Sequence, residues 1–245
     1  GTGRGSLYMT GSANATINSG GMAFYIEGGA SSNIATELSS LVGSSGSGNK
    51  LNITMNSGSN LIRWNAPTGG SINLSSISSL SSSIANVTVT GSNYNTLSIN
   101  KGELVIDENV ALTGTGNAYN GVEMSQSKVT LASGYNITGA LDGQIGIAQI
   151  NPGTLSDVSI TNNGTITLSG KKSTGLALDH GYITNTGTIE VTNPGITGEG
   201  SLGIFSANDT VTVNNGAINV SGIESVGIYG ANDFVAGTPA SYGTR

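Results

Sequence analysis

The pattern of apolar and polar positions is clearest between residues 161 and 230, where one short phrase occurs three times. The three copies are residues 162–168, 185–191 and 214–220, and each carries a turn glycine followed by alternating apolar and polar positions. A second phrase with a central glycine follows each copy, at residues 173–176, 201–204 and 225–228. The turn glycines are 23 and then 29 residues apart, and the second glycines are 28 and then 24 residues apart. A unit of this length with elastic spacing is typical of a solenoid, in which each repeat stacks on its neighbours.

The chemistry of one repeat indicates the kind of solenoid. An Asn-Gly pair supplies a sharp turn, since glycine adopts positive φ freely and asparagine tolerates it. After the first turn, Ile166 and Leu168 alternate with threonines, which gives one apolar and one polar face. Copies stacked in register about 4.8 Å apart bury the apolar face by forming parallel sheets around a shared core. The pattern therefore predicts an all-β fold, a single-stranded parallel β-helix with one or two short helical or loop insertions.

An array of Asn-Gly hairpins is the alternative fold. Hairpins need an alternating apolar strand on both sides of each turn. Residues 156–160 suit that role before Gly164, but residues 180–183 suit it poorly before Gly187. The β-helix is therefore the favoured prediction, with inward-facing side chains that stack on their equivalents. These are Ile166, Leu168, Leu176, Ile189, Val191, Ile204, Ile218, Val220 and Ile228.

The rest of the chain carries shorter runs in which apolar and polar residues also alternate. They are residues 6–10, 15–18, 21–26, 51–55, 60–62, 71–74, 86–89, 96–99, 103–106, 110–112, 121–124, 128–131, 135–137 and 143–147. No linker rich in proline or charge separates them, and the chain has only four prolines. We expect one continuous β-helical domain over residues 1–245, with the clearest repeats in 155–233, about nine or ten coils and roughly 45 Å of length.

Two stretches break the alternation and predict insertions. In residues 31–48, Ile34, Leu38 and Leu41 have helical spacing, so a short helix over 31–42 is expected before a Gly/Ser loop. Residues 63–70 are predicted to form a second insertion, a loop containing Pro67. Helical spacing also occurs in the serine-rich run 77–84, but serine is a poor helix former, and either state is compatible with it.

Composition narrows the possible functions. Of the 245 residues, 39 are glycine and 36% are hydrophobic, and the polar residues fall on turns and outward positions of the repeat. Eight basic and 14 acidic residues give a net charge of −6, which does not attract nucleic acid or anionic membranes. Cysteine is absent, so disulfides and thiolate chemistry are excluded, and a chain that crosses membranes unfolded avoids premature cross-linking.

Two segments carry a family resemblance. Ser201-Leu202-Gly203-Ile204-Phe205-Ser206-Ala207-Asn208 and Ser225-Val226-Gly227-Ile228-Tyr229-Gly230-Ala231-Asn232, each near an Asn-x-Gly-x-Ile-x-Val copy, resemble passenger repeats of large type V autotransporter adhesins. The similarity is greatest to the fusobacterial outer-membrane adhesins, and it covers residues 155–233. The resemblance implies a monomeric, cell-surface passenger segment, secreted across the outer membrane, that attaches to protein or glycan receptors on other bacteria or host cells. The family's signal sequence and C-terminal β-barrel are missing from this sequence, so the resemblance implies an interior piece of the passenger.

Several motifs imitate catalytic or cofactor sites. Residues 198–203 spell GxGxxG, but a strand is expected after them where a dinucleotide site needs a helix. Residues 164–173 resemble a phosphate loop that is one residue too long. His180 is the only histidine, which excludes His-based triads and histidine-rich zinc sites. Asp107 and Glu108 are adjacent on an extended segment and point to opposite faces, so they are expected to be surface charges. We therefore expect no catalytic residues, metal or cofactor.

Arg63 and Trp64 form the one patch whose composition suits partner binding, since Trp and Arg are frequent anchors of binding hot spots. The alternative is that Trp64 closes the core where a strand ends. The sequence thus predicts a non-catalytic adhesin passenger segment, with Arg63 and Trp64 as candidate partner-binding residues. A β-helical polysaccharide lyase or glycosidase, or an inert stalk that lifts a distal tip, is the alternative function. An enzyme would need a groove of clustered charges, and only 9% of the residues are charged.

Overall fold

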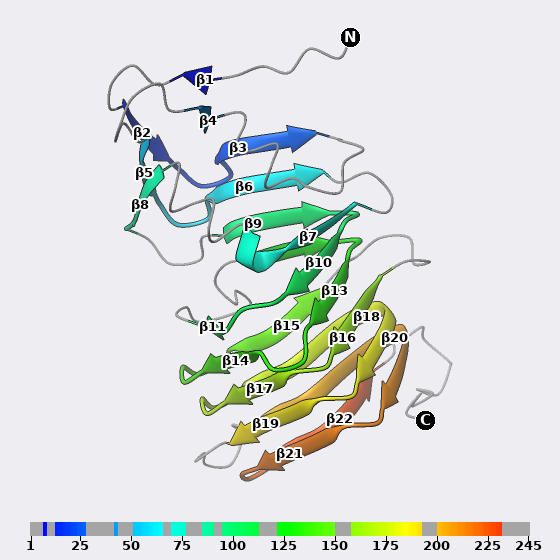
Figure 1. Cartoon of the computed structure of the whole chain (residues 1–245). Coiled ribbons are helices and arrows are strands. Elements are labelled where there is room, and N and C mark those ends of the chain that lie inside the picture. The colour runs from blue at the N-terminus through cyan, green and yellow to red at the C-terminus, as the bar shows by residue number, and fades with distance from the viewer. Residues whose placement is uncertain are drawn as a thin grey trace, which may run out of the picture.

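The computed structural model describes residues 7–8, 13–27, 42–43, 51–65, 70–76, 85–90, 95–112, 122–149, 158–192 and 200–231. These residues are almost entirely β-strand, with one helical turn at residues 74–76. Every strand pairing among them is parallel, and most pairs join strands one coil apart (Figure 1). Parallel pairing excludes the hairpin array, whose strands run antiparallel, and confirms the predicted all-β parallel β-helix.

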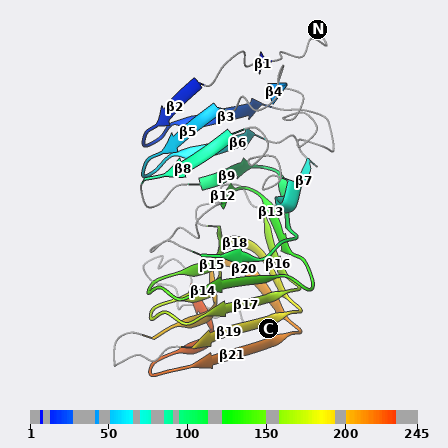
Figure 2. The ribbon, with the colours of Figure 1, turned by 60° about the vertical axis from the view of Figure 1, so that its left-hand side comes forward.

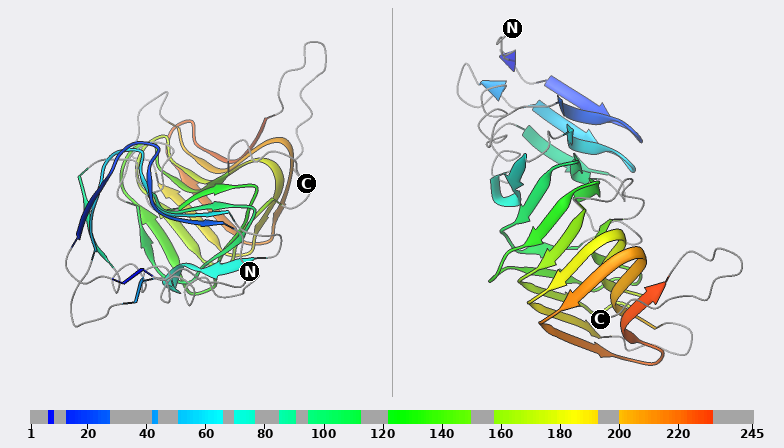
Figure 3. Two further views of the ribbon diagram at one scale, coloured as in Figure 1. Left: turned by 90° about the horizontal axis from the view of Figure 1, so that it is seen from above. Right: turned by 90° about the vertical axis from the view of Figure 1, so that its right-hand side faces the viewer.

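The strands form three walls, which the view along the stack in Figure 3 shows around a common interior. Face 1 consists of β2 (Ala13–Ile17), β5 (Leu51–Met55), β8 (Ala85–Val89), β11 (Val110–Ala111), β14 (Asn136–Gly139), β17 (Thr165–Leu168), β19 (Thr188–Thr192) and β21 (Ala217–Ser221). Face 2 follows it in each coil. It consists of β3 (Met22–Glu27), β6 (Asn60–Asn65), β9 (Asn95–Asn100), β12 (Val122–Ser125), β15 (Ile145–Gln149), the first halves of β18 (Thr174–Asn185) and β20 (Leu202–Asn214), and β22 (Val226–Ala231).

Face 3 completes each coil. It consists of β7 (Ser71–Asn73), β10 (Glu103–Ile106), β13 (Lys128–Leu131), β16 (Ser159–Asn162) and the second halves of β18 and β20. The short pair β1 (Leu7–Tyr8) and β4 (Val42–Gly43) precedes β2 and β5 in the chain as β7 precedes β8. The described strands thus make eight coils.

The predicted inward side chains stack as expected. Ile166 pairs with Ile189, which pairs with Ile218, and Leu176, Ile204 and Ile228 form a second column on face 2. The predicted residues of the first two repeats are fully buried, and Ile218, Val220 and Ile228 are partly buried against the core in the last coil. The apolar alternation therefore set the register correctly for faces 1 and 2 of the clear repeats.

The sheets differ in continuity. Face 3 runs unbroken from β7 to β20. On face 1 no pairing joins β8 to β11, and on face 2 none joins β12 to β15, within the described residues. Figure 2 shows the two resulting groups of strands, one above the other. Within the described residues, face 3 is therefore the sheet that runs through both groups of strands.

Glycine is required at the turn of each repeat for a physical reason other than the predicted positive φ. Gly164, Gly187 and Gly216 do not adopt positive φ. A Cβ on Gly187 would lie 2.0 Å from the carbonyl oxygen of Gly164, and one on Gly216 would lie 2.1 Å from that of Gly187. The turn glycine is thus required because consecutive coils approach there more closely than any side chain allows.

The two predicted insertions, at residues 31–48 and 63–70, are partly wrong in their bounds. Residues 63–65 continue β6, so the predicted second insertion does not begin at residue 63, because Ile62 and Trp64 maintain the alternation. Residues 66–69 lie outside the described residues. Val42, assigned to a helix in the sequence prediction, is in β4 and pairs with Leu7. Residues 31–41, 44–48 and 77–84 also lie outside the described part of the chain.

Candidate functional site

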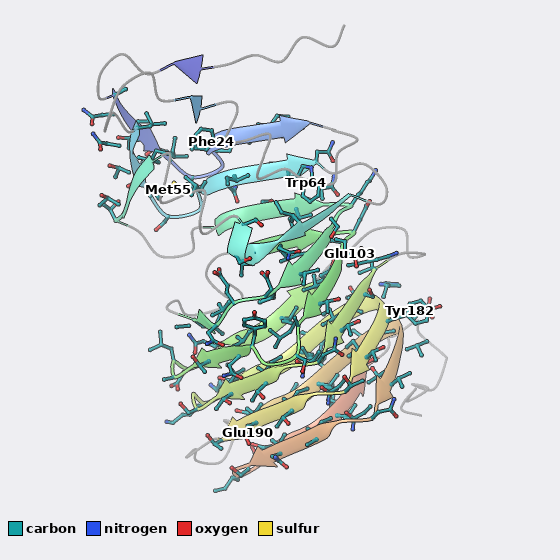
Figure 4. All side chains as sticks on the ribbon, viewed as in Figure 1. Phe24, Met55, Trp64, Glu103, Tyr182 and Glu190 are labelled. Carbon is teal, nitrogen blue, oxygen red and sulfur yellow. The ribbon has the colours of Figure 1, made fainter. Side chains whose placement is uncertain are left out.

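The structure separates the two predicted binding residues. Trp64 is fully buried in β6 and belongs to the hydrophobic core, with its backbone in register with Ile26 and Ile99 (Figure 4). Its Nε1 is buried without a hydrogen-bond partner in the described part of the structure, so the side chain contributes packing alone. Trp64 is therefore a core residue and is unavailable to a partner, as the alternative interpretation held.

Arg63 is exposed on the outer side of β6. Its neighbour in register on β3 is Tyr25, whose side chain is 52% exposed, and Ser98 lies on the other side. Arg63 and Trp64 thus point to opposite sides of one strand and cannot contact the same partner.

Asp107 has a structural role beside the helical turn. Its Oδ1 accepts a hydrogen bond from the Ser75 amide at 2.9 Å, and its Oδ2 accepts from the Ser75 hydroxyl at 2.7 Å and from Asn73 Nδ2 at 3.0 Å. Partial burial acts to raise the pKa of Asp107, but these hydrogen bonds outweigh it and hold the pKa below its ordinary value. The carboxylate therefore ties β10 to residues of the coil before it.

The motifs that imitate ligand loops are parts of the solenoid. Residues 165–168 of the phosphate-loop look-alike are strand β17, and the last residues of the GxGxxG run into β20 without a helix. In the part of the chain that the structure describes, no three His, Asp or Glu side chains group as a metal site would need.

A polar cluster that the sequence did not predict lies where β18 and β20 turn from face 2 to face 3. The register of the two strands shifts there: Asp179 pairs with Ala207, but Gly181 pairs with Thr210. One residue of β18 therefore faces two of β20, which defines a β-bulge. His180 and Asn208 adopt φ of 67° and 48°, a left-handed conformation that these residue types accept more readily than most.

The side chains at the bulge hold one carboxylate in place. Asp179 Oδ1 lies 2.7 Å from His180 Nδ1 and also accepts a hydrogen bond from Asn208 Nδ2. Because a carboxylate only accepts hydrogen bonds, Nδ1 carries a proton, which leaves Nε2 as the ring nitrogen open to a ligand. Asp179 is 18% exposed and His180 is 31% exposed, so both reach solvent. Asp179 Oδ2 and His180 Nε2 make no hydrogen bond within the described structure.

An apolar surface adjoins this group on face 3. Tyr182, two residues after His180, projects outward with 54% of its side chain exposed (Figure 4), and Val211 beside it on β20 is 50% exposed. We refer to Asp179, His180, Tyr182, Asn208 and Val211 as the corner cluster. It combines an aromatic ring, an aliphatic side chain, an amide, a carboxylate and an imidazole within two adjacent strands.

A second aromatic feature lies on face 2. Phe205 and Tyr229, neighbours in register on β20 and β22, stack with their ring centroids 5.9 Å apart and an interplanar angle of 13°. Phe205 also neighbours Ala177, whose side chain is buried. This pair is an outward ladder that ties consecutive coils together, at the aromatic position of the repeat.

Comparisons with models of protein families, with curated proteins and with solved structures found no match for this chain. Among the described residues, no helix has the length and apolarity needed to cross a membrane. The surface of the solenoid and its chemistry are therefore the features that bear on function.

Proposed function

We propose that this chain is a non-catalytic segment of a surface-displayed bacterial adhesin, and that it attaches the cell to protein or glycan receptors on other bacteria or host cells. The observation that carries the proposal is the stacking of the repeat phrases in register along one rod. Such a rod presents a long surface whose outward positions vary without disturbing the core. The same phrases carry the resemblance to autotransporter passengers.

The surface chemistry supports attachment without catalysis. The chain carries eight basic and 14 acidic residues. The one adjacent acidic pair, Asp107 and Glu108, includes a carboxylate that three hydrogen bonds already occupy. A surface of this kind binds through hydroxyl, amide and aromatic groups, and its binding depends little on salt.

The test is direct attachment. Beads coated with the purified chain are mixed with bacterial and epithelial cells, and soluble chain is added as competitor. Saturable binding that the soluble chain displaces supports the proposal. Binding no greater than that of beads coated with an unrelated β-helical protein contradicts it and favours the inert stalk.

A further inference from the structure

We propose that the corner cluster binds a neutral sugar residue of a glycan, with Tyr182 against the sugar's apolar C–H face, Asp179 accepting hydrogen bonds from its hydroxyl groups, and His180 Nε2 hydrogen-bonding to a further hydroxyl group. The inference rests on the proposed function, since it names the receptor chemistry that an adhesin segment would use.

The bulge and its hydrogen bonds fix the geometry of the polar side chains. The bulge re-aims the side chains around it, and bulges are over-represented next to functional sites. Asp179 Oδ1 is held by two donors, so the carboxylate cannot rotate freely, and 18% of the side chain is exposed to solvent. His180 Nε2 adds a second polar atom on a ring that Asp179 orients. Acceptors held in this way bind donor groups without a large entropic cost of ordering.

The polar side chains lie beside an exposed aromatic ring. Asp179 and Tyr182 are three residues apart on β18, a separation of at most about 10 Å along an extended strand. A sugar has hydroxyl groups around its rim and C–H groups on its face, and it therefore matches hydrogen-bond acceptors beside an aromatic ring. Val211 extends the apolar floor next to Tyr182.

The charge of the site and of the chain favours a neutral ligand. The carboxylate of Asp179 and the net charge of −6 repel sialylated, sulfated or phosphorylated sugars. A cationic ligand would also suit a carboxylate and a ring, but its affinity would fall as salt is added, whereas binding of a neutral sugar would not. The predicted ligand is therefore neutral, and salt dependence separates the two chemistries.

The experiment measures binding of the whole chain to an array of neutral hexose- and N-acetylhexosamine-terminated oligosaccharides and their sialylated counterparts. The best neutral oligosaccharide is then titrated by NMR at low and physiological salt. Tyr182→Ala should lower its affinity by at least about tenfold, because stacking is lost, while Tyr182→Phe retains it. Asp179→Asn should weaken binding, because it replaces a charged acceptor with a neutral amide.

Two matched variants serve as controls. Tyr25→Ala removes an equally exposed tyrosine, 52% against 54%, from the other half of the solenoid. Val213→Thr changes an exposed valine two residues beyond Val211. Both should bind the oligosaccharide like the parent, and all variants should melt at the parent temperature. The inference is overturned if no neutral glycan binds, if affinity falls with salt, or if Tyr25→Ala weakens binding as much as Tyr182→Ala. Loss through Val213→Thr would overturn it too, because a protein partner on the apolar strip would then explain binding better.

Cell attachment measured in parallel distinguishes this inference from the proposed function. If beads coated with the Tyr182→Ala variant still bind cells, and glycosidase treatment of the cells does not change that binding, the adhesin proposal is supported and the glycan site is contradicted. If neutral glycans bind through Tyr182 but the coated beads bind no cells, the glycan site is supported and the adhesin proposal is contradicted.

Discussion

The asparagine ladder on face 3 allows a quantitative test of how the coils are held together. Asn162, Asn185 and Asn214 stack at the ends of β16, β18 and β20. Asn162 Nδ2 donates to Asn185 Oδ1 at 2.7 Å, and Asn185 Nδ2 donates to Asn214 Oδ1 at 2.7 Å. Asn162 and Asn185 are fully buried, whereas Asn214 is exposed. The position before the ladder holds Leu131, so the column changes from apolar to amide between adjacent coils.

Asn185→Ala should destabilise the protein by about 2–4 kcal/mol, because two hydrogen bonds of about 1 kcal/mol each are lost and a buried donor is orphaned. The orphan is Asn162 Nδ2, whose remaining contact is a long one of 3.5 Å to the Thr188 carbonyl oxygen. Asn214→Ala is the matched control. It removes the hydrogen bond from Asn185 Nδ2 and the one to the Gly216 carbonyl oxygen, but at an exposed end where water reaches the groups left behind. It should therefore cost only about 0.5–1 kcal/mol.

The assay is urea unfolding followed by far-ultraviolet circular dichroism, with amide hydrogen exchange to locate the change. Since coils contact only their neighbours, the loss of protection should centre on β16, β18 and β20. Replacing Asn162, Asn185 and Asn214 together by leucine should recover part of the stability lost in Asn185→Leu alone, because no side-chain amide is then orphaned. The recovery is partial, since the buried Gly164 amide loses its hydrogen bond to Asn162 Oδ1. The reasoning is refuted if Asn185→Ala costs no more than Asn214→Ala, or if the triple leucine variant is the least stable.

Three further predictions test other parts of the fold. Gly175→Ala should lower the free energy of unfolding by about 1–3 kcal/mol through overpacking, since its Cβ would lie 2.5 Å from both the Gly203 carbonyl oxygen and Ile189 Cγ2. Gly230→Ala is the control: its Cβ would meet no atom within 4 Å, so urea unfolding should show almost no change in stability. Trp64→Ala should cost about 3–5 kcal/mol and Arg63→Ala almost nothing in the same assay, and equal effects would contradict the burial of Trp64. The stabilising effect of Asp107 should be fully present above its ordinary pKa of 3.8 and be lost as the pH falls through the lower folded-state pKa; the stability difference from Asp107→Asn should therefore shrink between about pH 5 and pH 2, and a constant difference would argue against it.

Local alternation predicted much of the fold because each face of the solenoid repeats a period-two pattern. All the short runs assigned to strands from the sequence overlap observed strands. Face 3 of the clear repeats was missed, because residues 180–185 mix a histidine, a glycine and a polar end with one buried isoleucine. Their strand state comes from pairing with β16 and β20, which sequence pattern alone does not show.

The candidate site was harder to predict, for two physical reasons. The single tryptophan, Trp64, was predicted to be a candidate binding residue because tryptophan is frequent in binding hot spots. Tryptophan is also the largest side chain available to fill the core, and Trp64 is fully buried. Asp179, His180 and Asn208 have no motif in common and are brought together across two coils. A lone histidine next to an aspartate carries little signal until the register of the strands is known.

One inserted residue accounts for both the corner cluster and the exposed strip beside it. The second glycines Gly175 and Gly203 are 28 apart, whereas the turn glycines Gly187 and Gly216 are 29 apart, so β20 has one more residue than β18 between them. A shift of one residue reverses which side chains of a strand face the core. Thr210 and Thr212 are accordingly buried, at 7% and 4% exposure, and the valines that alternation would place inside are outside.

The buried hydroxyl groups and the ladder together stabilise this reversed register. Thr210 Oγ1 donates to the Ala207 carbonyl oxygen at 2.6 Å, and Thr212 Oγ1 donates to Ser206 Oγ at 3.1 Å, so neither buried hydroxyl is unpaired. Asn214 is aligned with Asn185, and only the reversed register permits that pairing. The extra residue is absorbed at Asn208, where its amide contacts Asp179, and it turns Val211 outward beside Tyr182. The difference of one residue between the two glycine spacings is thus the sequence signal that marks the site.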